Sequence, residues 1–211
     1  MFDYTLLHWT TFLLAATLLN LSPGPDIAFI LGQTVRSGRR AGFAAMFGIW
    51  SGAFGHVLMA AAGLSVILAS SAVAFSVVKW AGAAYLIFLG LKALRSDGGS
   101  FVAEGGPVRA GFPTIYKQGL TVGLLNPKVA IFFLAFLPQF VVQGAGPVWA
   151  QLFLHGFLII VVAGVIEPPL VILGDKLTGK LRANSKIGLW MDRTLGGIFV
   201  ALGLRLAMEE R

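Results

Sequence analysis

Two interruptions of apolar stretches constrain this chain more than any other feature. The first falls inside an apolar run from residue 4 to 35 and consists of Ser22, Pro23, Gly24, Pro25 and Asp26. The second interrupts a run from 116 to 142 and consists of Asn126, Pro127 and Lys128. A proline removes a backbone donor and crowds the carbonyl one turn earlier, so the helix opens there. Within a membrane such breaks persist where they face protein or a watery cavity, and paired breaks indicate a transporter's binding site.

The composition indicates an integral membrane protein. Hydrophobic residues make up 57% of the sequence, 12% are charged and the mean hydropathy is +0.84, which is too apolar for a soluble domain. The sequence has no cysteine, which excludes disulfides, thiolate metal sites and cysteine nucleophiles. A cleavable signal peptide is not expected, because the first residues include Asp3 rather than a basic cluster.

The basic residues are distributed as expected for membrane topology rather than for nucleic-acid binding. The formal net charge is +7, and most of the basic residues fall in three clusters between apolar runs: Arg36, Arg39 and Arg40; Lys92, Arg95, Arg109 and Lys117; and Lys176, Lys180, Arg182, Lys186 and Arg193. The segments 69–71 and 142–146 carry no charge. Because basic loops stay in the cytoplasm, this pattern predicts that both termini lie outside.

Six apolar runs are long enough to cross a bilayer, at about 4–35, 41–68, 72–94, 116–142, 148–173 and 190–208. We predict an all-α integral membrane protein with a single membrane domain made of two inverted three-helix repeats, 1–95 and 116–211, joined by a cytoplasmic linker at 96–115. Residues 21–23 match 125–127, and 83–92 match 196–205. The alternative is two unrelated proline kinks.

Two charged residues follow the breaks directly. Asp26 is predicted to open a half-helix at 27–35, either as a proton carrier or counter-charge for a substrate amine, or as an ordinary N-cap. Lys128 opens the second half-helix and is expected to meet a substrate carboxylate or to pair with Asp26; the alternative is that its stem reaches to the interface. Backbone amides freed beside Pro23, Gly24 and Asn126 form a general anion site.

Two further residues are candidates for proton binding. Glu167, followed by Pro168 and Pro169, is either a second intramembrane proton site or a residue near the cytoplasmic end of its span. His56 could titrate near neutral pH and relay protons, or simply bond between helices.

No enzymatic activity, metal or cofactor is predicted. Ser51 lies between Gly48 and Gly52 with the wrong spacing for an intramembrane protease, and no metal-ligating or phosphate-binding motif occurs. The glycine pairs Gly48 with Gly52 and Gly119 with Gly123 allow close helix approach, either within one chain or at a homodimer face.

The sequence closely resembles the LysE/RhtB family of bacterial amino-acid exporters over nearly its whole length. The resemblance rests on residues 21–25, 48–56, 61–64, 82–90, 119–120, 126–128, 132–133, 137–140 and 203–206. It implies an inner-membrane protein that exports amino acids or related metabolites, driven by the proton gradient. The segment 167–169 is not a feature of the family pattern and could mark altered specificity or coupling.

The leading hypothesis is therefore a proton-coupled exporter in which a zwitterionic amino acid binds between the breaks. Its partners would be the amino acid, protons and the lipid bilayer, without nucleic acid. Two alternatives remain: export of another small solute or a metal cation, for which the chain offers few ligands, and a non-transporting membrane scaffold, which would not need opened helices.

Overall fold

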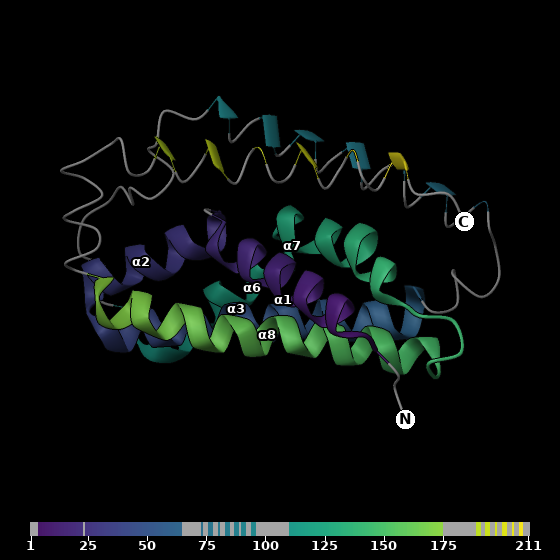
Figure 1. Ribbon diagram of the computed structural model, residues 1–211. Coiled ribbons are helices and arrows are strands. Elements are labelled where there is room, and N and C mark those ends of the chain that lie inside the picture. The colour runs from purple at the N-terminus through teal and green to yellow at the C-terminus, as the bar shows by residue number, and fades with distance from the viewer. Residues whose placement is uncertain are drawn as a thin grey trace.

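The computed structural model describes residues 4–22, 24–64 and 110–174 without further gaps, and isolated positions within 73–95 and 189–208. All regular structure in these residues is helical (Figure 1). The predicted spans 72–94 and 190–208 lie mostly outside the described residues, as do Pro23, positions 65–68 and the linker up to residue 109. The inverted repeat thus stays a prediction.

Both predicted helix breaks are confirmed. The first lies between α1 (Leu6–Leu21) and α2 (Pro25–Ser37), whose axes bend by 50°. The second lies between α6 (Phe112–Leu124) and α7 (Pro127–Ile131), and the bend is 49°. Beyond α7 the chain continues as a π turn, Phe132–Phe136, and a 3-10 turn, Leu137–Phe140.

Two helix starts lie earlier than the sequence predicted. The half-helix after the first break, predicted at 27–35, begins at Pro25, and α6 begins at Phe112 instead of residue 116. In each case a proline occupies the first turn, where its missing N–H would have had no intrahelical partner. Pro25 therefore starts α2 as well as interrupting the first apolar run.

Two unbroken helices flank the breaks. These are α3 (Arg39–Met59), extended by a π turn at Ala60–Leu64, and α8 (Val148–Ile172). Both are long and apolar enough to cross a membrane, and within the described part of the chain the number of candidate spans rises to four if each bent pair counts as one. Gly38 joins α2 to α3 with a φ of +82°, a conformation that favours glycine.

The glycine pairs of α3 and α6 pack against each other inside the chain. A Cβ atom added to Gly123 would lie 2.6 Å from the carbonyl oxygen of Ile49, and one added to Gly48 would collide with the carbonyl oxygen of Tyr116. The two helices run parallel, since Ala45 faces Gly119 and Gly52 faces Gly123. Of the two expectations for these glycines, internal packing is present.

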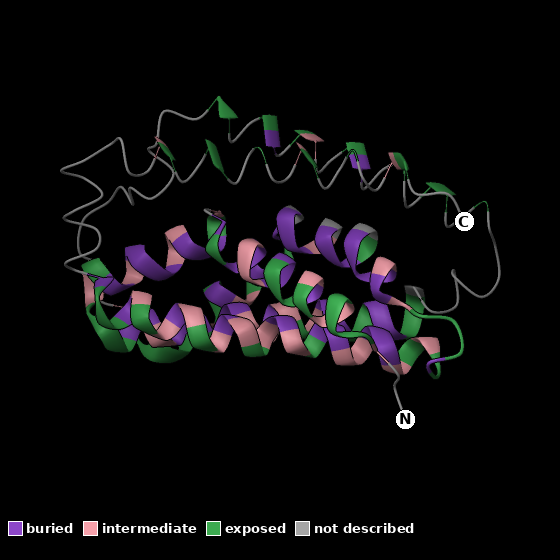
Figure 2. Ribbon diagram, in the orientation of Figure 1, coloured by how far each residue is buried: buried purple, intermediate pink, exposed green. Residues whose placement is uncertain are grey.

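Most helices carry both buried and exposed residues (Figure 2). The exposed residues include many large apolar side chains. One buried cluster joins α1, α8 and the turns after α7, and includes Phe12, Phe133 and Phe140. A second joins α2, α3 and α6, and includes Ile30 and Met46. The outward apolar surface fits a lipid environment.

Candidate functional site

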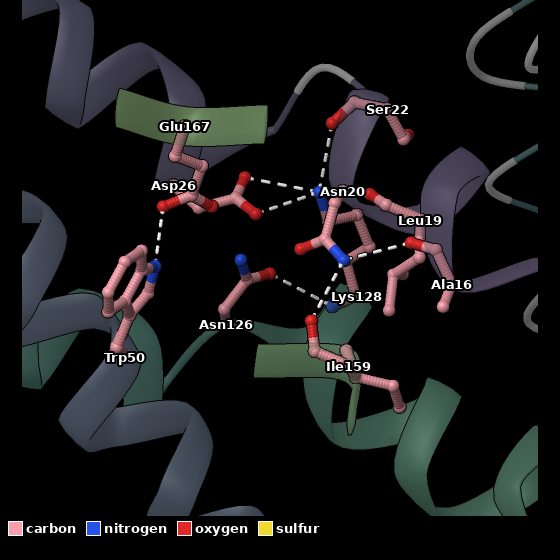
Figure 3. Close-up of polar contacts among 10 residues, drawn as sticks. All are labelled: Ala16, Leu19, Asn20, Ser22, Asp26, Trp50, Asn126, Lys128, Ile159 and Glu167. Carbon is pink, nitrogen blue, oxygen red and sulfur yellow. Dashed lines mark hydrogen bonds and ion pairs between the residues drawn. The ribbon is translucent and has the colours of Figure 1, made fainter. Parts of the chain in front are cut away.

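A buried ion pair connects the two helix breaks. The Nζ atom of Lys128, in the first turn of α7, lies 2.9 Å from Oδ2 and 3.1 Å from Oδ1 of Asp26, in the first turn of α2 (Figure 3). The two side chains are only 6% and 8% exposed. Residues more than a hundred positions apart thus form one charged centre, and Lys128 does not extend to the interface.

The open end of α1 supplies further partners for the lysine. The Lys128 ammonium also donates to the carbonyl oxygens of Ser22 at 3.0 Å and Leu19 at 3.4 Å. These carbonyls lie at the C-terminus of α1, where the partial charge of a helix is negative. The lysine therefore satisfies groups that the break had freed, as well as neutralising the carboxylate.

Asp26 does not cap α2, so the interpretation of Asp26 as an ordinary N-cap is wrong. The N-cap position is Gly24, and Asp26 lies inside the first turn of α2. Its negative charge is favourable there because the helix N-terminus carries partial positive charge. A Cβ atom on Gly24 would lie 2.6 Å from Oδ1 of Asp26 and 3.0 Å from Nζ of Lys128, so the ion pair packs directly on this glycine.

Asn126 caps α7 and leaves one polar atom available. Its side-chain oxygen accepts a hydrogen bond of 3.0 Å from the backbone N–H of Lys128. Its Nδ2 atom is buried and has no hydrogen-bond partner among the described residues, although Asn126 is only 1% exposed. An unpaired buried donor is costly, and here it lies beside the ion pair (Figure 3).

Glu167 extends from α8 toward the same centre. It is 3% exposed, and its Oε2 atom accepts a hydrogen bond of 2.7 Å from the indole N–H of Trp50 on α3. The close-up shows its carboxylate beside Asp26, with which it interacts electrostatically, as it does with Lys128 (Figure 3). Glu167 lies close to the end of α8 at Ile172, and its side chain is buried inside the protein.

His56 lies at the second break and bonds its backbone. Its Nε2 atom is 3.1 Å from the carbonyl oxygen of Leu124, the last residue of α6. The helix break leaves this carbonyl without an intrahelical partner. His56 is therefore placed to stabilise the opened helix end, which agrees with the alternative that it bonds between helices. Its predicted role as a proton relay has no support from these contacts.

Sequence reasoning did not assign polar contacts to Trp50, Asn20 or the imidazoles of His8 and His155. Asn20 donates to the carbonyl oxygen of Ala16 and, at 3.2 Å, to that of Ile159 on α8. A polar residue one turn before a break was the available signal for Asn20. Among the described residues no group of three or more His, Cys, Asp and Glu could hold a metal ion.

Two opened helices around an enclosed charged centre are typical of membrane transporters. The sequence matches the model of the LysE type translocator family over residues 17–210. The chain belongs to this family.

Two groups of relatives are similar over almost the full length. The homoserine/homoserine lactone efflux protein of Salmonella typhimurium (strain LT2) is 30% identical over 199 residues, 94% of this chain and 95% of the relative. The leucine efflux protein of Salmonella choleraesuis is 28% identical over 205 residues, 97% of each chain. No solved structure matches.

Proposed function

We propose that this protein exports amino acids or close derivatives across the bacterial inner membrane by proton-coupled antiport, with both termini in the periplasm. The observation that carries the proposal is an acid and a base, each at a helix break, joined as a buried pair. The names of the relatives, efflux proteins for homoserine, its lactone and leucine, support an amino-acid substrate.

The ion pair resembles the substrate that it would bind. An amino acid carries an ammonium and a carboxylate close together, so it can replace the internal pair charge for charge. Its ammonium would bind Asp26, and its carboxylate would bind Lys128 and the free Nδ2 atom of Asn126. Without substrate, Asp26 and Lys128 neutralise each other, which avoids leaving two isolated charges in the membrane.

Glu167 is the better candidate for the coupling proton. Asp26 is already paired with the Lys128 ammonium at 2.9 Å, whereas the hydrogen bond to Glu167 comes from a neutral indole. With Glu167 protonated, the cluster of Asp26, Lys128 and Glu167 is electrically neutral. With all three groups charged, the cluster holds one excess negative charge, which a substrate with a second positive charge would balance.

Glu167→Gln is therefore expected to separate exchange from coupling. Glutamine keeps an acceptor for Trp50 but cannot release a proton, so labelled substrate should still exchange for unlabelled substrate in proteoliposomes at equal pH. Accumulation driven by a pH gradient should fall at least ~10-fold. Trp50→Phe serves as the comparison, because it removes the indole donor and leaves the carboxyl group able to titrate. Full gradient-driven accumulation by Glu167→Gln would refute this assignment.

Substrate identity is tested by growth and by efflux. Cells that overproduce the protein should resist toxic concentrations of its substrate among the amino acids, their analogues and lactones. Efflux from preloaded cells should then confirm each substrate found. If no amino acid or derivative leaves faster than from control cells, and the breaks prove inaccessible to water-soluble reagents, a scaffold role is favoured.

A further inference from the structure

A second cluster of titratable groups lies away from the charged centre. The Nε2 atoms of His8 on α1 and His155 on α8 are 2.8 Å apart. His155 is 1% exposed, whereas His8 is partly exposed. The helical rise of 1.5 Å per residue places His155 roughly 18 Å along α8 from Glu167. The histidine pair therefore lies far along the helix axis from the charged centre.

The pair lies at the end of the molecule opposite the basic turn between α2 and α3. Gln151, one turn before His155, bonds Tyr4 and the backbone of Val142 and Gly146. These contacts tie the start of α1 to the uncharged segment before α8, which the positive-inside rule assigns to the outer face. Phe12 and other apolar side chains of the first core cluster separate the pair from the charged centre.

Hydrogen bonds determine which protonation states the pair can hold. The Nδ1 atom of His155 lies 2.8 Å from the backbone carbonyl oxygen of Gln151, which can only accept, so this nitrogen carries a hydrogen. In neutral His155 the Nε2 atom must then accept, and the Nε2–H of His8 donates. A first proton can bind Nδ1 of His8 without disturbing this bond. A second proton, on the Nε2 atom of His155, leaves two N–H donors facing each other and a positive charge on each ring.

Burial opposes positive charge on both imidazoles, and their contacts among the described residues provide no anion to hold two charges. Aromatic rings of Tyr4, Trp9, Phe12 and Phe140 surround His155, with Trp9 stacked at 5.5 Å and 16°. Aromatic faces stabilise a cation by their quadrupole. Among the described residues, Tyr4 is the one other titratable side chain that makes a ring contact with the two imidazoles. Their ring contacts and hydrogen bonds, from α1, α8 and the turn at Leu137–Phe140, include no carboxylate and no Lys or Arg in this part of the chain.

We propose that His8 and His155 form a proton-binding site that holds α1 against α8 at the outer face and releases them when it takes up its second proton. Acid outside would thereby open the route from the charged centre to the periplasm. This role in transport rests on the proposed function, whereas the protonation and the separation of the helices do not.

Because the sequence has no cysteine, a single introduced thiol reports whether a water-soluble reagent reaches its position. Ala16 is fully buried on α1 in the apolar cluster between the two sites. In sealed right-side-out vesicles, a membrane-impermeant thiol reagent should label Ala16→Cys at least ~5-fold faster at about pH 5 than at about pH 8. Rates are normalised to Gln143→Cys, an exposed position in the outer segment, because thiol reactivity itself falls in acid.

Adding His155→Gln should remove the acid-induced labelling, since glutamine can bond His8 but takes up no proton. His8→Gln, at the partly exposed side, repeats the test if the first variant folds poorly. Trp9 emission, isolated by comparison with Trp9→Phe, should change with pH only when His155 is present. Acid-induced labelling that survives both glutamine variants, or is absent in the parent, would overturn the proposal. Neither the thiol labelling nor the Trp9 emission requires transport. A failure of this proposal is therefore distinguishable from a failure of the proposed export function.

Discussion

Lys128→Met is expected to abolish efflux and to destabilise the protein strongly. The substitution removes the ammonium that neutralises Asp26 and that bonds two freed carbonyls of α1. Breaking a buried pair by removing one partner costs about 3–5 kcal/mol, because the other charge stays buried. Asp26→Asn should likewise abolish efflux, and both effects are measured as thermal unfolding in detergent and as efflux from preloaded cells.

The double variant distinguishes a structural role from a binding role. Asp26→Asn combined with Lys128→Met leaves no unpaired charge at the breaks, so it should recover most of the lost stability and still fail to transport. Lys117→Met, on an exposed position of the neighbouring α6, is the matched control and should change neither property. Transport at the parent rate by the double variant would show that the pair does not bind substrate.

Gly123→Ala is expected to disrupt the contact between α3 and α6. Its new methyl group would lie 2.6 Å from the carbonyl oxygen of Ile49, a backbone atom that cannot move away alone. Overpacking of this kind costs about 1–3 kcal/mol, and helix separation would also shift Asn126 and Lys128, which follow on the same broken helix. Both unfolding temperature and efflux should fall.

Gly63→Ala is the control for this substitution. An added Cβ atom at Gly63 meets nothing within 4 Å, so the replacement should be neutral or slightly stabilising through reduced backbone freedom. Equal effects of the two substitutions would contradict a specific role for the glycine contact.

The helix breaks and the charges beside them were predictable because they depend on local chemistry. Proline cannot continue a helix at membrane depth, and an acid or base in the same segment needs a partner. The pairing of Lys128 with Asp26 was one of two partners expected for that lysine, and it is present. Its role in binding substrate stays a prediction.

The remaining contacts depend on which helix faces meet, and one sequence does not define these. Nothing in the neighbourhood of Trp50 indicates a bond to Glu167, and nothing near His8 points to His155, which is 147 positions away. Asp26 was open to two interpretations, because an acid after a break suits both capping and a role as proton carrier or counter-charge for a substrate amine. Gly24 takes the N-cap position, and the functional role of Asp26 stays a prediction.

The close contact of α3 with α6 determines how the molecule can move. The backbones of α3 and α6 touch at their glycines, so the two helices cannot slide past each other without losing all of these contacts. This contact, the α3–α6 seam, is therefore expected to stay fixed while other helices move around it. Opening the charged centre then requires α1 to separate from α8, because α8 packs against α3 and stays with the seam. A small molecule that held α1 and α8 together would arrest that separation, while one bound outside the seam would leave it free.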